Sequence, residues 1–478
     1  MPSRPDVDRR GEVSAALLAD LRSTISSSRV LTGGPEYVSS VTLFNAAVDI
    51  RPAVIVRCAT AADVQAAVRA AGEHGVPVSV RGGGHDFWGR ALRSGGLVID
   101  LAEMRGVRVD ADRRVAAVEG GALSSDVVAA AERVGLTAVT GTAGAVGMVG
   151  ITLGGGYGPL TGRFGLAADN LLGAEVVLAD GSRVDTDAEH EPDLFWALRG
   201  GGGNFGVVTS ARIRLHPVPT VVTGTIFYPI SQASRVLADL GEILQGGPDE
   251  LTVDVGLLPG ADGAPAVYVA PTWSGNLDEG AAENGPVHAL TRLGTPLLVD
   301  IGRPARSAGL AATDAMFPVG RMGAIRSRNI SGISASITDV LVQGAQAFTS
   351  PFSAILLHQF HGAAARVPLD STAFGRREPH QMAELISLWE KGDDIAGDGD
   401  GGARHLRWVE QLHAALEPFS LPGGYVNFLG PETPDQVARS YGPNTERLLA
   451  IKSAVDPDSV FVGTPLPSDA PGTASPTF

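Results

Sequence analysis

Two glycine-rich segments contain the residues whose types and spacing indicate ligand chemistry. Arg81-Gly82-Gly83-Gly84-His85 directly follows the apolar run 76–80, and the second segment, 139–158, contains no charged side chain. Consecutive glycines allow successive backbone N–H groups to point at one anion, because no Cβ blocks a close approach. The two segments lie about sixty residues apart, a spacing that suits two loops of one fold holding one extended ligand with a pyrophosphate group.

A third glycine motif, 201–206, reads Gly-Gly-Gly-Asn-Phe-Gly and matches the G-x-G-x-x-G pattern of dinucleotide-binding Rossmann units. That pattern has its function only between a strand and the helix that it opens. Here the motif follows a predicted helix at 193–198 and precedes a predicted strand at 207–215. We therefore reject the Rossmann interpretation.

Composition and charge exclude several classes of protein. The 478 residues include 44% hydrophobic and 19% charged residues, a globular balance in a chain long enough for at least two folded units. A net charge of −15 argues against a nucleic-acid partner. Cys58 is the single cysteine, so no intrachain disulfide can form, and the charged N-terminal residues predict neither a signal peptide nor a membrane span. We expect a cytoplasmic protein without nucleic-acid or membrane partners.

The elements around the first glycine segment follow an α/β pattern. A strand at 54–56 precedes a helix that Thr60 and Asp63 begin as a capping box, and strands follow at 76–80 and 97–101. A hairpin is predicted at 107–118 and a helix at 124–134, and a second hairpin pairs 176–178 with 182–185 around Asp180-Gly181.

A boundary is predicted near residue 219, where two prolines end the strand 207–215. Beyond it, short β-like runs alternate with helical stretches, which indicates an α+β fold. The predicted strands are 222–228, 251–257, 266–273 and 352–358, and the predicted helices are 232–245, 380–391 and 404–416. The acidic segment 392–402 lacks the ligand spacing of a calcium-binding EF-hand and is interpreted as a solvated loop. No metal site is predicted.

Several segments, in order, resemble the flavin domain of the vanillyl-alcohol oxidase and p-cresol methylhydroxylase flavoproteins, most closely the berberine-bridge-enzyme-like branch. They are RGGGHDFWGR (81–90), LVIDL (97–101), VGMVGITLGGGYG with GLAADNLLGAEVVLADG (146–181), PDLFWALRGGGGNFGVVTSARIRLHPV (192–218), GGYVNFLG (423–430) and RLLAIKSAVDPDSVF (447–461). The resemblance implies an α+β fold with a two-subdomain FAD-binding domain. Residues 1–218 would form that domain, residues 425–478 would complete it, and 219–424 would be an inserted substrate domain with an antiparallel sheet over the flavin.

The resemblance also implies FAD as the cofactor, with one covalent link to the ring of His85. Such a link raises the reduction potential of the flavin. Relatives with a second link carry a cysteine at a position that falls on or near Ala143, so a single link is expected, and Cys58 is interpreted as a buried core thiol. The residues expected to contact FAD are Arg81, Gly82, Gly83, Gly84, His85, Asp86, Gly89, Gly141, Gly147, Gly150, Gly154, Gly155, Gly156, Tyr157, Gly158, Asn170, Val207, Val208, Tyr425 and Asn427.

Oxidation of a substrate needs a group that accepts a proton while hydride leaves. Tyr425, which with Asn427 belongs to a block that reaches the flavin in the resembling family, is the first candidate. A free phenol has a pKa of about 10, so this role requires a neighbouring cation or the polar edge of the flavin. His358 and His361 are alternatives on a β-like run, where they face opposite sides of the sheet. Phe428 replaces a second tyrosine of many relatives.

These residues predict an FAD-dependent oxidase that takes hydride from a C–OH or C–N group of a small organic substrate, with O2 as the acceptor. Two alternatives stay open. A flavin dehydrogenase would use another acceptor, and Val149, where relatives often have glycine, adds bulk that would hinder oxygen. A non-catalytic flavin-binding or drug-binding protein would keep the loops and lose the proton acceptor, against which Tyr425 and the histidine-bearing run argue.

Overall fold

The computed structural model describes residues 14–260, 263–393 and 402–467. Its first sheet has the order β1-β2-β4-β3, with parallel pairing of β2 and β3 to β4. Its strands and flanking helices are β1 (Val30–Leu31), β2 (Val54–Arg57), β3 (Val78–Arg81), β4 (Leu97–Asp100), α1 (Ala15–Thr24), α2 (Gly34–Val41) and α3 (Ala61–Glu73). The predicted capping box begins α3, where Thr60 Oγ1 accepts a hydrogen bond from the Asp63 amide at 3.2 Å. The first glycine loop begins where β3 of this unit ends.

The second sheet is antiparallel, with the order β5-β6-β10-β8-β9, and β7 pairs with β10. Its strands are β5 (Val107–Asp110), β6 (Val115–Glu119), β7 (Thr137–Ala138), β8 (Leu171–Val177), β9 (Arg183–Thr186) and β10 (Val207–His216), accompanied by α4 (Ser124–Glu132), α5 (Met148–Leu153), α6 (Thr161–Phe164) and α7 (Pro192–Ala197). Both predicted hairpins are confirmed. The motif 201–206 follows α7 and precedes β10, which confirms that it opens no Rossmann helix.

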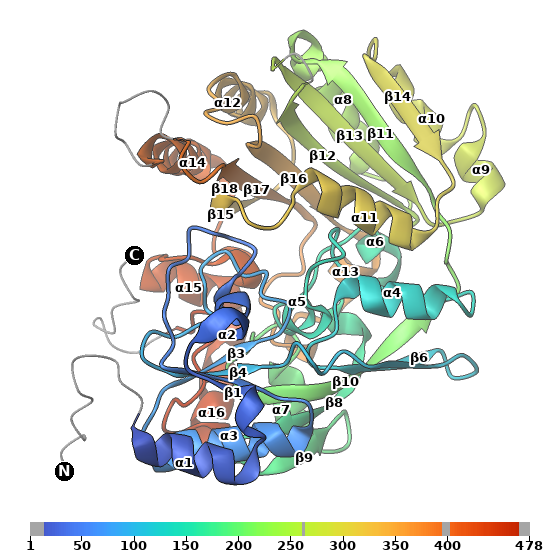
Figure 1. Ribbon diagram of the computed structural model, residues 1–478. Helices are drawn as coiled ribbons and strands as arrows, with labels where there is room; N and C mark the ends of the chain where they lie inside the picture. The colour runs from blue at the N-terminus through green and yellow to red at the C-terminus, as the bar shows by residue number, and fades with distance from the viewer. Residues whose placement is uncertain (1–13, 261–262, 394–401, 468–478) are drawn as a thin grey trace.

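The third sheet is a larger antiparallel layer with the order β14-β11-β13-β12-β16-β17-β15-β18. Its strands are β11 (Val222–Pro229), β12 (Leu251–Pro259), β13 (Pro265–Trp273), β14 (Leu298–Gly302), β15 (Met322–Ile330), β16 (Ala354–Phe360), β17 (His380–Trp389) and β18 (Ser420–Leu421). The helices of this part are α8 (Ala233–Leu244), α9 (Leu277–Ala281), α10 (Pro286–Ala289), α11 (Arg306–Met316), α12 (Ala335–Gln346), α13 (Gly362–Arg366) and α14 (Ala403–Leu416). Helices α8, α12 and α14 cover one face, and the other face looks toward the first two sheets (Figure 1).

The predicted helix 380–391 is wrong, because this segment is the central strand β17. It pairs with β16 on one side and β15 on the other, and every residue from His380 to Trp389 is buried. A strand buried on both faces loses the alternation of polar and apolar residues that identifies a surface strand. Its apolar residues then repeat at spacings that also fit a helix.

The C-terminal segment returns to the first two sheets through α15 (Pro434–Tyr441) and α16 (Thr445–Val455). Tyr441 and Leu448 are fully buried in the core formed with β6, β8 and β10, and Phe461 packs in the core of the first sheet. The buried Lys452 Nζ donates to the carbonyl oxygens of Asn204 at 2.8 Å and Phe461 at 2.7 Å. The first two sheets and the C-terminal segment therefore form one folded unit from distant parts of the sequence.

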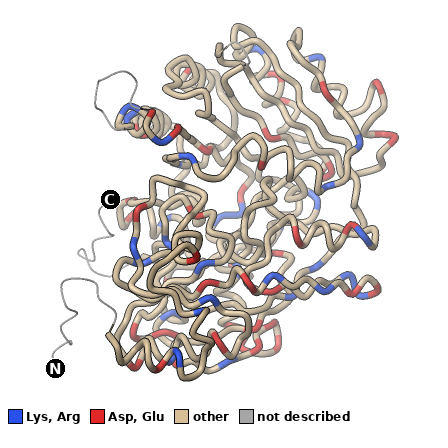
Figure 2. Tube along the Cα trace, in the orientation of Figure 1, with Lys and Arg blue, Asp and Glu red and all other residues tan. Residues whose placement is uncertain are grey.

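The distribution of charged residues and of possible metal ligands among the described residues adds no further site to this fold. Acidic and basic residues are interspersed along the part of the chain that the structure describes (Figure 2). Within 14–260, 263–393 and 402–467, no cluster of three or more His, Cys, Asp or Glu residues is arranged to hold a metal ion. None of the helices in these ranges is both long and apolar enough to cross a membrane. Most of the acidic segment 392–402, at 394–401, lies outside the described residues.

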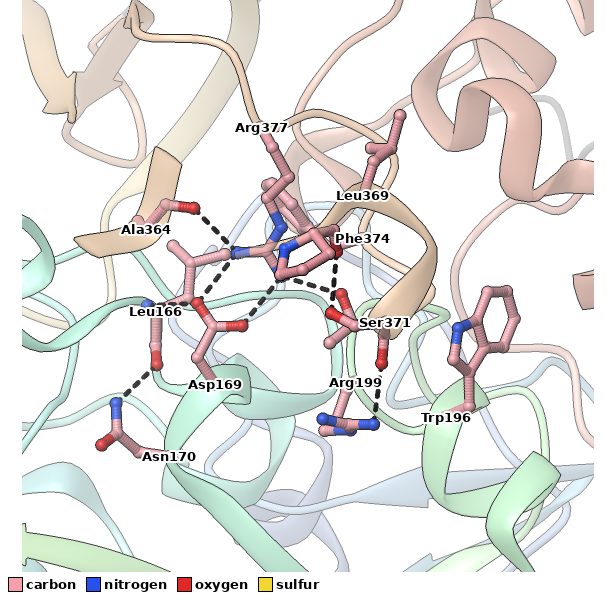
Figure 3. A network of polar contacts seen from close by, with 12 residues as sticks. Leu166, Asp169, Asn170, Trp196, Arg199, Ala364, Leu369, Ser371, Phe374 and Arg377 are labelled. Carbon is pink, nitrogen blue, oxygen red and sulfur yellow. Dashed lines mark hydrogen bonds and ion pairs between the residues drawn. The ribbon is translucent and has the colours of Figure 1, made fainter. Parts of the chain in front are cut away.

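A buried polar network joins the second sheet to the inserted part (Figure 3). Asp169 and Arg377 form a two-pronged ion pair at 2.8 and 2.9 Å, with side chains only 8% and 5% exposed. Arg377 also donates to Thr372 Oγ1 at 2.7 Å, and Arg199 donates to the Ser371 carbonyl at 2.8 Å. These contacts hold the segment 369–377 against α7.

Asp169→Asn is expected to lower the free energy of unfolding by about 3–5 kcal/mol, because it leaves the Arg377 charge buried without its counter-ion. Asp193→Asn is the matched control, since Asp193 pairs with Arg447 at the surface with side chains 70% and 47% exposed and an exposed pair contributes about 1 kcal/mol or less. Denaturant unfolding of both variants measures the difference. Equal losses for the two variants would contradict a structural role for the buried pair.

Candidate active site

A cavity of about 350 Å³ lies between the two glycine loops, the third sheet and the C-terminal segment. Ligand pockets measure roughly 300–1,000 Å³, so this cavity has the size of a ligand-binding site. The predicted residues on its wall are Gly82, Gly83, Gly84, His85, Asp86, Gly141, Gly147, Gly150, Tyr157, Val208, His358, Tyr425 and Asn427.

The two glycine loops meet each other at the base of this cavity. A Cβ on Gly147 would lie 2.6 Å from the Gly83 nitrogen, and a Cβ on Gly83 would collide with the Gly147 backbone. Only glycine permits this contact between backbones. A Cβ on Gly150, by contrast, would have no neighbour within 4 Å, because this glycine faces open space. The loops therefore present bare backbone to a ligand.

Two buried polar atoms on the cavity wall support an anionic, polar ligand. Ser79 Oγ and Arg90 Nη1 have no hydrogen-bond partner among the described residues, and both side chains line the cavity. The rest of the Arg90 guanidinium is held by Asp86 at 2.9 Å and by the Asn427 carbonyl at 3.0 Å. A buried donor without a partner is costly, so these groups fit the hydroxyls and phosphates of a bound dinucleotide such as FAD.

Other residues predicted to contact the cofactor lie outside the cavity. They are Arg81, Gly89, Gly154, Gly155, Gly156, Gly158, Asn170 and Val207. Arg81 pairs with Asp100 at 3.0 Å, and Asn170 Nδ2 donates to the carbonyls of Phe164 and Leu166. The three glycines 154–156 pack against Asn427, Phe374 and Ala167, and so they allow neighbouring chain segments to approach rather than a ligand.

His85 lies on the cavity wall with its ring stacked on Phe44, at 3.9 Å between centroids. Burial lowers the pKa of His85 to about 4, against the opposing effect of a backbone hydrogen bond and the charges of Asp314 and Asp86. The imidazole is therefore neutral near pH 7 and keeps a lone pair for bond formation. Ala143 also lines the cavity, whereas Cys58 is fully buried in the core of the first sheet, as predicted.

Tyr425 lies on the cavity wall as a buried hydrogen-bond acceptor. Its hydroxyl accepts from the Gly156 amide at 3.0 Å and from Asn427 Nδ2 at 2.8 Å. Burial raises the pKa of Tyr425 to about 12, although these hydrogen bonds act in the opposite direction. A phenol with this pKa stays protonated near neutrality, which opposes the predicted role of Tyr425 as a base and favours a role in orienting substrate.

Tyr157 connects Tyr425 to the third sheet. Its hydroxyl lies 2.7 Å from His380 Nε2, and its ring meets the Tyr425 ring edge-on at 4.7 Å. His380 Nδ1 is 2.7 Å from the Glu378 carbonyl, which can only accept, so Nδ1 carries the proton. Burial lowers the pKa of His380 to about 4. The neutral ring therefore accepts the Tyr157 proton at Nε2 and fixes the orientation of the phenol.

His358 is bound on both sides by carboxylates that sequence reasoning missed. Its Nε2 lies 2.8 Å from Glu384 Oε2, and its Nδ1 lies 3.1 Å from Asp254 Oδ1. Burial acts to lower the pKa of His358, but the hydrogen bonds and charges of the two carboxylates outweigh it and raise the pKa to about 10. The ring is therefore an imidazolium near pH 7. Glu384 lines the cavity beside it.

The two predicted histidines, His358 on β16 and His361 directly after it, lie in different places. His358 enters the cavity, whereas His361 contacts Thr252 Oγ1 at 3.4 Å and does not line the cavity. Burial lowers the pKa of His361. Glu384 escaped prediction because 380–391 was interpreted as a helix. As part of β17, Glu384 pairs with Leu356 across the sheet, next to His358.

Comparisons with known proteins agree with this architecture. Residues 52–187 match the FAD binding domain family, and residues 424–463 match the berberine and berberine-like family. The FAD-linked oxidoreductase aurO of Gibberella zeae is 33% identical over 473 residues, covering 96% of this chain and 89% of that protein.

Two solved structures show the same fold over nearly the whole chain. The 6-hydroxy-D-nicotine oxidase of Arthrobacter nicotinovorans has a TM-score of 0.83 at 29% identity, covering 94% of this chain and 98% of that one. The glucooligosaccharide oxidase of Acremonium strictum, described with a 6-S-cysteinyl, 8α-N1-histidyl FAD, has a TM-score of 0.80 at 25% identity, covering 93% and 98%. With the two glycine loops, the cavity and the returning C-terminal segment, these matches show that the chain belongs to the FAD-linked oxidoreductases of the berberine-like family.

Proposed function

We propose that this FAD-dependent oxidoreductase is an oxidase that takes hydride from a C–OH or C–N group of a small organic substrate. FAD, when bound, supplies the hydride acceptor and passes the electrons to O2, which yields H2O2. The two glycine loops, Ser79 and Arg90 would hold it, and His85 would carry the single covalent link. The 6-hydroxy-D-nicotine and glucooligosaccharide oxidases among the relatives support the choice of O2 as acceptor.

Glu384 carries the proposed proton transfer. Its carboxylate is buried on the cavity wall, and the bond from His358 to Oε2 leaves Oε1 for a substrate O–H or N–H group. Asp254 holds the imidazolium on its far side, and the ring donates from Nε2 to Glu384 Oε2. Glu384 then accepts the substrate proton while hydride leaves. Tyr425 keeps its proton, and its hydroxyl donates a hydrogen bond that orients the substrate.

Glu384→Gln is expected to slow anaerobic flavin reduction on the order of 10²-fold, because the amide keeps the shape of the carboxylate but accepts no proton. Flavin content should stay unchanged. Tyr425→Phe serves as the comparison and is expected to slow reduction less than Glu384→Gln. The opposite order, with the larger loss in Tyr425→Phe, would return the proton acceptor to Tyr425.

The acceptor is tested in the same preparation. Reduced enzyme is mixed with air-saturated buffer, and H2O2 release is measured together with recovery of the flavin absorbance. An oxidase recovers its colour with one H2O2 for each substrate oxidised. Slow recovery without H2O2 would favour a dehydrogenase, and Val149 on the cavity wall would then be the residue to replace with glycine.

A further inference from the structure

The wall that the third sheet contributes to the cavity is apolar except at one place. Leu356, Met382, Ile386 and Leu388 line the cavity from β16 and β17. Among the described strand residues of this sheet on the wall, only His358 and Glu384 are polar, and they bind each other. On this wall a substrate therefore meets the His358 and Glu384 pair and an otherwise hydrocarbon surface, while Tyr425 lines the cavity from the C-terminal segment.

Aromatic side chains extend this surface beyond the sheet. Phe317, at the end of α11, and Phe428, in the C-terminal segment, both line the cavity and pack against the cluster that contains Ile386 and Leu388. Apolar area removed from water contributes roughly 25 cal/mol per Å². Aromatic faces add preferred stacked or edge-to-face contacts with a ring. The surface thus favours binding of a ring compound with few polar groups.

Sugars are poorly matched to such a wall. Each hydroxyl buried without a partner costs about 1–3 kcal/mol. Binding a sugar tightly requires several dispersed donors and acceptors, whereas the sheet offers the His358 and Glu384 pair alone among its described wall residues. The Glu384 and Asp254 carboxylates also occupy both ring nitrogens of His358, so this ring has no further hydrogen bond to offer a sugar hydroxyl.

We propose that the substrate is a flat, largely apolar ring compound with a hydroxyl or amino group on the carbon to be oxidised. This inference rests on the proposed role of Glu384, which receives the O–H or N–H of that group, and it excludes sugars as substrates. The substrate loses one hydride to the flavin and one proton to Glu384. A hydroxyl carbon becomes a carbonyl, and an amino carbon becomes an imine.

The test uses holoenzyme and three probes: 9-hydroxyfluorene, 9-aminofluorene and cellobiose. Binding is measured by titrating each probe while following the flavin absorbance spectrum, and reaction by anaerobic bleaching. Both fluorene probes are expected to bind at least ten times more tightly than cellobiose, and the probe that bleaches faster identifies a hydroxyl or an amino substrate. Failure of both fluorene probes to perturb the spectrum, or binding of cellobiose as tight as theirs, would overturn the substrate class.

Substitutions in the third sheet test whether its apolar wall is responsible for fluorene binding. Met382→Gln and Leu356→Gln each place an amide in the apolar wall and should weaken fluorene binding on the order of tenfold, about 1.4 kcal/mol. Leu406→Gln is the control, because Leu406 is 48% exposed on α14. Unchanged binding in both wall variants would overturn the proposal. Tight fluorene binding without flavin bleaching would support the substrate class and contradict the proposed oxidation. Flavin bleaching by cellobiose alone would support the proposed oxidation and overturn the substrate class.

Discussion

His85→Ala is expected to convert acid-stable flavin into flavin that acid releases completely. Wild-type protein precipitated with acid should remain yellow, and the variant should leave its flavin in the supernatant. The reason is the position and protonation state of the ring. His85 lies on the cavity wall, burial lowers its pKa to about 4, and the neutral imidazole has a free lone pair at the pH of the cell.

His361→Ala is the matched control, since His361 is also buried but does not line the cavity. It should retain acid-stable flavin. The His85 variant should still bind FAD without the covalent link, because the backbone of the two glycine loops, Ser79 and Arg90 remain. Complete release of flavin from the wild-type protein would contradict the covalent attachment.

Ending the chain after Leu421 is expected to abolish stable flavin incorporation, although both glycine loops remain. Leu421 ends β18, so the third sheet keeps all its strands. The truncation removes Tyr441, Leu448 and Phe461, each at most 2% exposed in the cores of the first two sheets. Burial of such a side chain contributes roughly 1.5–3 kcal/mol, against a total stability of about 5–15 kcal/mol.

Size-exclusion chromatography with flavin absorbance at the protein peak measures the outcome. A chain ending at Pro467 is the control, because it retains Tyr425, both C-terminal helices and Phe461. It should remain soluble and yellow. A soluble, monodisperse and fully flavinylated chain that ends at Leu421 would show that the tail is a separate appendage, and the place of Tyr425 in the site would then need another explanation.

Local sequence determined most of what lies close together along the chain. The Thr60 and Asp63 capping box, the Asp180-Gly181 turn and the glycines of the two loops act through backbone conformation within a few residues. The context of the motif 201–206 was local as well, so the Rossmann interpretation was rejected correctly. Six ordered segments resembling one flavoprotein family then indicated FAD, His85 and the return of the C-terminal segment.

Tertiary structure alone placed the residues proposed to accept the proton and the wall around them. Asp254, His358 and Glu384 lie 104 and 26 residues apart in sequence and meet only because β12, β16 and β17 are neighbours in register. Strand β17 carried no alternation to reveal it, because both of its faces are buried. Glycines 154–156 were likewise predicted as ligand contacts, and only the structure shows that they pack against Asn427, Phe374 and Ala167. The repeat of apolar residues indicates which face of a single helix or strand is buried. The order of strands in a sheet and the partner of a buried side chain depend instead on the packing of the whole chain.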